Sequence, residues 1–177
     1  LCSGPDGGQS CSKFCSELPT SFIVDRLTLT KKLIRDASTI VAPSQFVAGI
    51  FNHEIDGIKV QINHHGIRQN NLHALGRIYK AEDPVRFGFI GNLAIHKGVH
   101  VLISAFKELN VKQASLSIYG SGEKVFVDKL QELAGDNRIS FKGSFAAENL
   151  GEVLDQIDVL VAPSVCYETY SFVVHEA

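Results

Sequence analysis

Two acidic residues near the end of the chain, Glu168 and Glu176, are the first whose type and spacing suggest chemistry. They lie eight positions apart, a separation of at most about 12 Å if the whole stretch were helical. That separation suits a long ligand with hydroxyl groups at two places better than a single metal ion or reacting atom. Taken alone, however, the pair is explained more simply as two carboxylates on a solvated helix face.

The residues around these glutamates predict a strand, a loop and the start of a helix. Residues 159–162 form a short apolar run that stops at Pro163, which is typical of a buried parallel strand. In open α/β sheets, ligands bind beyond the carboxyl ends of the strands. Residues 172–174 predict a first helical turn, whose unbonded backbone amides suit an anion. The two glutamates would then hold hydroxyl groups on either side of a phosphate, and we expect Cys166 to be a small packing residue.

The second half of the chain alternates strands and helices. We expect strands over residues 85–91, 115–119 and 138–142 and from 158 onward, and helices over 99–109, 124–133 and 148–154. Strand, glycine and helix in this repeated order predict a parallel, doubly wound α/β sheet with right-handed crossovers. The loop from Asn92 to Gly98, after the first strand, would accommodate a phosphate.

The first half predicts a smaller α/β unit. We expect a helix from Thr20, strands over 39–42 and 59–62, and a helix over 46–51 with Ser44 as its N-cap. The apolar face of the first helix is expected to contain Ile23, Leu27, Leu33, Ile34 and Ala37. His64 and His65 are interpreted as surface or hinge residues rather than as metal ligands or acid/base groups.

Residues 1–19 form a turn-dense loop that contains Cys2, Cys11 and Cys15. With a fourth ligand such as His53, these thiols would hold zinc or an iron–sulfur cluster. Their spacing matches no standard pair of C-x2-C knuckles, so reduced cysteines or one disulfide are an equal alternative.

Composition excludes several classes of protein. The 177 residues are 45% hydrophobic and 20% charged, as in ordinary soluble globular proteins. A formal net charge of −2 without blocks of like charge predicts no nucleic-acid partner. The chain lacks methionine and stops one residue after Glu176. We therefore expect it to belong to a longer protein and to have no catalytic activity by itself.

The ordered motifs resemble the retaining glycosyltransferases of family 4, the group 1 type. The matching residues are Gly91, Lys97-Gly98, Gly120, Gly122, Gly143, Pro163-Ser164, Glu168 and Glu176-Ala177. The resemblance covers residues 85–177 well and 20–67 weakly. It implies a GT-B fold with two Rossmann-like domains, the second incomplete. Residues 1–67 would end the acceptor-side domain, 68–84 would be a linker, and 85–177 would bind the nucleotide-sugar donor.

The resemblance also implies roles for single residues. Lys97 would bind the leaving diphosphate and Glu168 the transferred sugar, and these two are the expected catalytic residues. Glu176 would bind the ribose hydroxyls. The remaining donor-binding positions are Gly91, Asn92, Gly120, Gly122, Gly143, Thr169, Tyr170, Ser171 and Phe172. Asn92 stands where the family usually has Arg, and Tyr170-Ser171 stand where Phe or Ser followed by Gly or Pro is usual. Asn donates hydrogen bonds but cannot neutralise a phosphate.

The implied activity is transfer of a sugar from a nucleoside diphosphate sugar to a glycan or lipid-linked acceptor, with retention of configuration. No metal or cofactor is required where Lys and helix amides stabilise the departing diphosphate. The family also implies a cytoplasmic protein of polysaccharide biosynthesis, with peripheral membrane contact left open. Two alternatives remain: a Rossmann-like oxidoreductase or epimerase, and a noncatalytic sugar-nucleotide binding module. For the first, Gly120-x-Gly122 is only half of the dinucleotide fingerprint.

Overall fold

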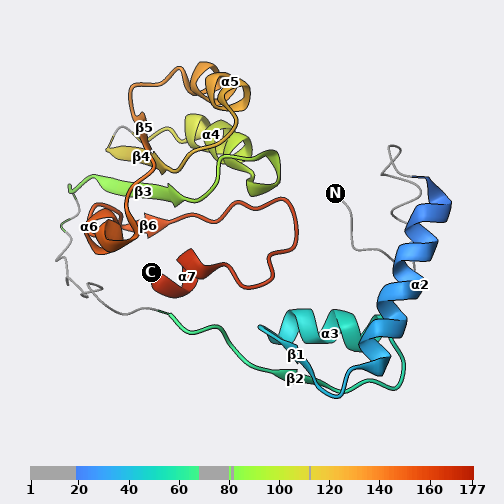
Figure 1. Cartoon of the computed structure of the whole chain (residues 1–177). Helices are drawn as coiled ribbons and strands as arrows, with labels where there is room; N and C mark the ends of the chain where they lie inside the picture. Colours follow the sequence, from blue (N-terminus) through green and yellow to red (C-terminus); the bar gives the residue numbers. More distant parts are fainter. Residues whose placement is uncertain (1–18, 68–79, 81, 112) are drawn as a thin grey trace. The chain divides into compact units, whose positions relative to one another are not determined.

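The structure is a computed structural model that describes residues 19–67, 80, 82–111 and 113–177. The chain divides into two compact units. Unit 1 comprises residues up to Gly66 together with Glu168–Tyr170, and unit 2 comprises Ile67–Tyr167 and Ser171–Ala177. Figure 1 labels the helices and strands of both units, and each unit is described by itself below.

Unit 1 is a small parallel α/β arrangement. Its elements are α2 (Thr20–Asp36), β1 (Ile40–Ala42), α3 (Gln45–Glu54) and β2 (Val60–Ile62). The two strands pair in parallel, with Ile40 opposite Val60. The Ser44 hydroxyl accepts the Val47 N–H at 3.3 Å, so the predicted N-cap of α3 is confirmed. Both strands are one residue shorter than expected.

The expected apolar face of α2 is only partly confirmed. Ile23 is buried at 5% exposure, whereas Leu33 is 62% exposed. Ten residues separate the two, and at about 100° per residue Leu33 points roughly 80° away from Ile23. Ala37 lies beyond the last helical residue, where the backbone is extended. The buried stripe of α2 is therefore narrower than the spacing suggested.

Unit 2 contains a four-stranded, fully parallel sheet in the order β5-β4-β3-β6. Its strands are β3 (Val85–Ile90), β4 (Ala114–Tyr119), β5 (Ile139–Gly143) and β6 (Val159–Leu160). The chain adds strands outward from β3 to β5 and then returns to the other side of β3. Strand order thus reverses between β3 and β6, which confirms the predicted doubly wound, Rossmann-like sheet.

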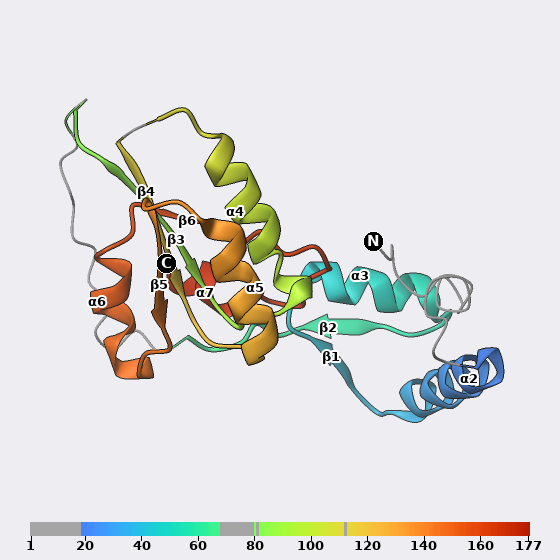
Figure 2. The same cartoon turned by 90° about the horizontal axis from the view of Figure 1, so that it is seen from above.

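The helices of unit 2 cover both faces of this sheet. They are η2 (Ile95–Lys97), α4 (Val99–Glu108), α5 (Lys124–Ala134), η3 (Ala147–Asn149), α6 (Leu150–Leu154) and α7 (Phe172–Glu176). Figure 2 shows α4 and α5 on one side of the sheet and α6 on the other. Right-handed crossovers that run in opposite directions along a sheet place their helices on opposite faces, which explains this arrangement. The helix predicted over 148–154 is a 3-10 turn followed by α6, because Asn149 leaves the helical region at φ −92° and ψ 6°.

The core of unit 2 lies between α4, α5 and the sheet. Val99, Ile103 and Phe106 of α4 are fully or almost fully buried and pack with buried residues of β4 and α5. Burial of each such side chain contributes roughly 1.5–3 kcal/mol. The predicted helix included Leu109, but α4 ends at Glu108 and Leu109 is 39% exposed.

The strand before the glutamate loop is shorter and more exposed than predicted. β6 has two residues, opposite Phe87 and Gly88 of β3, and Val159 is 40% exposed. It is the last strand in the described sheet, which accounts for this exposure. Its start is fixed by Asp158, whose N–H donates to Arg86 O at 2.7 Å and whose carboxylate accepts the Arg86 N–H at 2.9 Å. The Arg86 Nε also donates to this carboxylate, at 3.0 Å.

Candidate functional site

The loops that follow β3 and β6 meet at the carboxyl edge of the sheet in unit 2. The Val165 N–H donates to His96 O at 2.9 Å. Gly98 has φ +70°, and a Cβ built on it would lie 2.0 Å from Pro163 O, so only glycine permits this approach. Lys97, half-buried in η2, is therefore held directly beside the start of the glutamate loop. These are the two loops at the point where strand order reverses, which is where doubly wound sheets bind ligands.

The predicted glycines lie along the same edge of the sheet. The Gly91 N–H donates to Tyr119 O at 3.0 Å, and the Gly120 N–H donates to Gly143 O at 2.8 Å. A Cβ on Gly120 would lie 1.8 Å from Gly91 O. A Cβ on Gly122 would likewise lie 2.1 Å from Leu93 O. Backbone hydrogen bonds thus join the ends of β3, β4 and β5, and the close contacts of Gly120 and Gly122 leave no room for a side chain at these two positions.

The loop after β3 combines a cation with the start of a ten-residue helix. Lys97 and Gly98 immediately precede α4, which begins at Val99. The partial positive charge at the amino end of a helix adds to the charge of a nearby lysine, and both favour an anion. Asn92, at the other end of this loop, is exposed and supplies hydrogen bonds without charge.

Three residues of the glutamate loop belong to unit 1. The Ser44 hydroxyl donates to Thr169 O at 2.9 Å, and the Tyr170 hydroxyl donates to His65 O at 3.1 Å. The Tyr170 ring also lies edge-on to the His65 ring, with centroids 5.0 Å apart and an interplanar angle of 90°. Glu168 is half-buried in this segment. His65 is exposed, in line with the predicted surface or hinge role.

The remaining predicted residues of this stretch, Ser171, Phe172 and Glu176, belong to unit 2. Ser171 has φ 57° and ψ 72°, a left-handed conformation, and α7 begins at Phe172 as predicted. Glu176, in the last turn of α7, is half-buried. Lys97 and Glu176 therefore belong to unit 2, whereas Glu168 belongs to unit 1. Cys166 was expected to be a packing residue, but it is exposed because it lies in a bend of the loop.

The cysteine-rich segment and most of the expected linker lie outside the described residues. Within the part of the chain that the structure describes, there is no group of three or more His, Cys, Asp or Glu residues that could hold a metal ion. Metal binding by Cys2, Cys11 and Cys15 stays a prediction.

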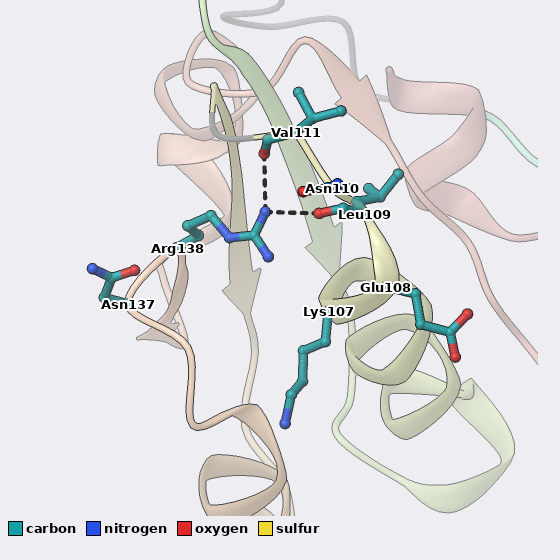
Figure 3. A pocket seen from close by; sticks show the side chains of 7 residues that line it. All are labelled: Lys107, Glu108, Leu109, Asn110, Val111, Asn137 and Arg138. Atoms are coloured by element: carbon teal, nitrogen blue, oxygen red, sulfur yellow. Dashed lines mark hydrogen bonds between the residues drawn. The ribbon is translucent and has the colours of Figure 1, made fainter.

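A pocket at the amino edge of the sheet has a different character (Figure 3). The Arg138 guanidinium donates to Leu109 O at 3.0 Å and to Val111 O at 2.9 Å, and it pairs with Asp136 at 2.7 Å. This hydrogen-bonded pair lowers the pKa of Asp136 and raises the pKa of Arg138. Lys107 donates to Leu133 O at 2.7 Å. Because both cations hold backbone carbonyls together, we assign this pocket a structural role.

The comparisons with known proteins agree with the topology. The family model described as "Glycosyl transferases group 1" matches residues 84–177, more than half of the chain. The chain belongs to this family. Glycogen synthase of Francisella philomiragia subsp. philomiragia is 27% identical over 95 residues, which cover 52% of this chain and 20% of that protein. The chain thus spans about a fifth of this curated relative.

Solved structures extend the likeness of this group 1 chain to both units. Sucrose-phosphate synthase from Thermosynechococcus elongatus is similar with a TM-score of 0.71 and 18% identity, covering 86% of this chain and 41% of that one. HepE of Anabaena in complex with UDP is similar with a TM-score of 0.73 and 22% identity. The match covers 86% of this chain and 46% of that one. The predicted GT-B fold is confirmed, and so is the resemblance to group 1 glycosyltransferases. Assignment to family 4 and retention of configuration stay predictions.

The bonds from Ser44 to Thr169 and from Tyr170 to His65 were not predicted from the sequence. The partners of the Ser44–Thr169 bond are 125 positions apart, and no local pattern signals such a bond.

Among the described residues, no helix is long and apolar enough to cross a membrane.

Proposed function

We propose that this group 1 glycosyltransferase chain binds a nucleoside diphosphate sugar and serves its transfer, with retention of configuration, to a glycan or lipid-linked acceptor. The observation that carries the proposal is the bond from Val165 N–H to His96 O, which holds the lysine loop against the loop after β6. Crystal structures of HepE contain UDP with glucose and UDP-glucose, which supports a donor of this class. Residues 85–177 are proposed as the donor-binding domain, in a cytoplasmic protein.

Lys97 is proposed to act on the leaving group. When the bond to the anomeric carbon breaks, negative charge builds on the diphosphate. A lysine ammonium fixed beside the amino end of α4 binds this charge more strongly in the transition state than in the bound donor. Such a difference accelerates the reaction, whereas equal binding of both states would not. With Asn92 in place of a second cation, Lys97 carries more of the charge compensation.

The two glutamates are proposed to bind hydroxyl groups. Glu176 accepts hydrogen bonds from the ribose, and Glu168 accepts them from the transferred sugar. The backbone amides of residues 169–172 are proposed to bind the sugar and the phosphate. Hydrogen bonds to a charged acceptor contribute about 1.5–3 kcal/mol each. Because chemistry requires departure of the diphosphate and not attack by a carboxylate, neither glutamate needs to be a nucleophile.

The test uses the full-length protein and measures release of nucleoside diphosphate and transfer of sugar to acceptor. Lys97→Ala and Glu176→Ala should each lower turnover at least about 100-fold. Lys129→Ala and Glu132→Ala, at exposed positions on α5, are matched controls and should leave turnover unchanged. Near wild-type rates for both site variants would refute the proposal. Binding of donor without transfer or hydrolysis would identify a noncatalytic binding module instead.

A further inference from the structure

We infer that Ser44 and Tyr170 are positioning residues that set the place of Glu168 from unit 1. The inference rests on the proposed function, because it assigns Glu168 to the transferred sugar. It adds that unit 1, to which Glu168–Tyr170 belong, holds this segment through Ser44 and His65. The two residues that follow Glu168, Thr169 and Tyr170, each form a hydrogen bond within unit 1.

Ser44 links the start of α3 to the glutamate loop through one hydroxyl group. Its oxygen accepts the Val47 N–H at 3.3 Å, and its O–H donates to Thr169 O at 2.9 Å. Both the donor and an acceptor site of the hydroxyl are thus in use, so its orientation is fixed. Because capping already holds Ser44 at the start of α3, the bond to Thr169 ties the loop to a rigid element.

Tyr170 provides a second point of attachment on the next residue. Its hydroxyl donates to His65 O at 3.1 Å, and its ring packs edge-on against the His65 ring at 5.0 Å. The neighbouring His64 is held as well: its Nδ1 lies 3.0 Å from Pro43 O, and since a carbonyl only accepts, Nδ1 carries the proton. The segment that contacts Tyr170 is therefore hydrogen-bonded, through His64, to Pro43, the residue before Ser44.

These two attachments define the position of Glu168. Thr169 and Tyr170 directly follow Glu168, and consecutive Cα atoms are about 3.8 Å apart, so tethering both residues restricts where Glu168 can lie. A carboxylate that accepts sugar hydroxyls must be held to within a fraction of an ångström, and a misplacement of about 1 Å costs up to about 100-fold in rate. Loss of either attachment should thus weaken recognition of the sugar more than recognition of the nucleotide.

Three substitutions of Ser44 separate positioning from helix capping. Ser44→Ala removes both bonds. Ser44→Asp keeps an acceptor for Val47 N–H but cannot donate to Thr169 O, and Ser44→Thr keeps both functions. Tyr170→Phe removes the hydroxyl and keeps the ring, so it tests the bond to His65 O alone.

The experiment compares kcat for transfer and the affinities for UDP and UDP-glucose in the full-length protein, using GDP or ADP with their glucose conjugates if those are the donors turned over. Ser44→Ala, Ser44→Asp and Tyr170→Phe should lower kcat about five- to ten-fold and remove the gain in affinity that the sugar gives. UDP affinity should fall less than UDP-glucose affinity, because Glu168 contacts only the sugar, and Ser44→Thr should behave as wild type. Wild-type kcat in Ser44→Asp, with a loss in Ser44→Ala alone, would show an effect of the α3 cap and overturn the inference.

Amide hydrogen exchange of the peptide around residues 166–172, measured without donor, distinguishes failure of this inference from failure of the proposed function. Exchange should be faster in Ser44→Asp and Tyr170→Phe than in wild type. Unchanged exchange together with unchanged kcat would overturn the inference and leave the proposed transfer intact. A wild-type protein that binds neither nucleotide nor donor would contradict the proposed function itself, whatever the exchange shows.

Discussion

Val165 donates its backbone N–H to His96 O at 2.9 Å, and this bond joins the two loops that follow β3 and β6. The approach depends on Gly98, whose φ is +70° and whose Cβ position is occupied by Pro163 O. The lysine loop and the glutamate loop are therefore a single packed feature at the point where strand order reverses.

The first prediction concerns Gly98. Gly98→Ala should lower the free energy of unfolding by about 2–4 kcal/mol, because a Cβ there meets backbone that cannot move aside. Gly135→Ala is the matched control: its φ is also positive, +48°, but the nearest atom to a Cβ is 3.7 Å away. Gly135→Ala should lower the free energy of unfolding by only about 1 kcal/mol. Urea unfolding followed by circular dichroism measures both, and equal costs would contradict the packing argument.

The second prediction concerns the anchor of β6. Asp158 is 3% exposed in its side chain and pairs with Arg86, and removing one member of a buried pair typically costs about 3–5 kcal/mol. Arg86 is 31% exposed, so we expect about 2–3 kcal/mol for Asp158→Ala. Asp128→Ala, which breaks an exposed pair with Lys124, should change unfolding by less than about 0.5 kcal/mol. A small effect at Asp158 would mean that β6 is held by other contacts.

The third prediction is a dependence on acid. Arg138 lowers the pKa of Asp136 below its ordinary value of 3.8, first through side-chain hydrogen bonds. A carboxylate with a lowered pKa in the folded state adds stability that is fully present above the ordinary value. This stability is lost as the pH falls below about 4 towards the folded-state pKa. Between pH 6 and pH 3, the melting temperature should therefore fall less steeply in Asp136→Asn than in wild type. Identical slopes of melting temperature against pH would contradict the assignment.

The fourth prediction concerns Ser171. Its left-handed conformation, φ 57°, is costly for a residue with a Cβ, and its side chain makes no capping bond to α7. Ser171→Gly should stabilise the protein by about 0.5 kcal/mol after the added freedom of the unfolded chain is counted. Ser171→Pro should destabilise it, because proline fixes φ near −65°. Destabilisation by glycine and tolerance of proline in melting experiments would show that the left-handed conformation is absent.

Much of unit 2 was predictable because its signals are local. The buried face of α4 and the glycines after β3 and β4 follow from spacing and from glycine chemistry, and the structure places them as expected. Exposure of Val159 was not predictable from its apolar neighbours, since it depends on the place of β6 in the sheet. The tether from Ser44 to Thr169 depends on a fold that brings distant residues together. Local patterns therefore indicated which residues to inspect, and tertiary contacts decided how they are held.

The most direct test of the account is calorimetric titration of UDP, or of the diphosphate of the donor turned over, into the full-length protein and its Lys97→Ala variant. A charged hydrogen bond is worth about 1.5–3 kcal/mol, so the variant should bind about 10- to 100-fold more weakly. The Lys129→Ala control should bind as wild type does. Equal affinity of wild type and Lys97→Ala would contradict the claim that the loop after β3 binds the diphosphate.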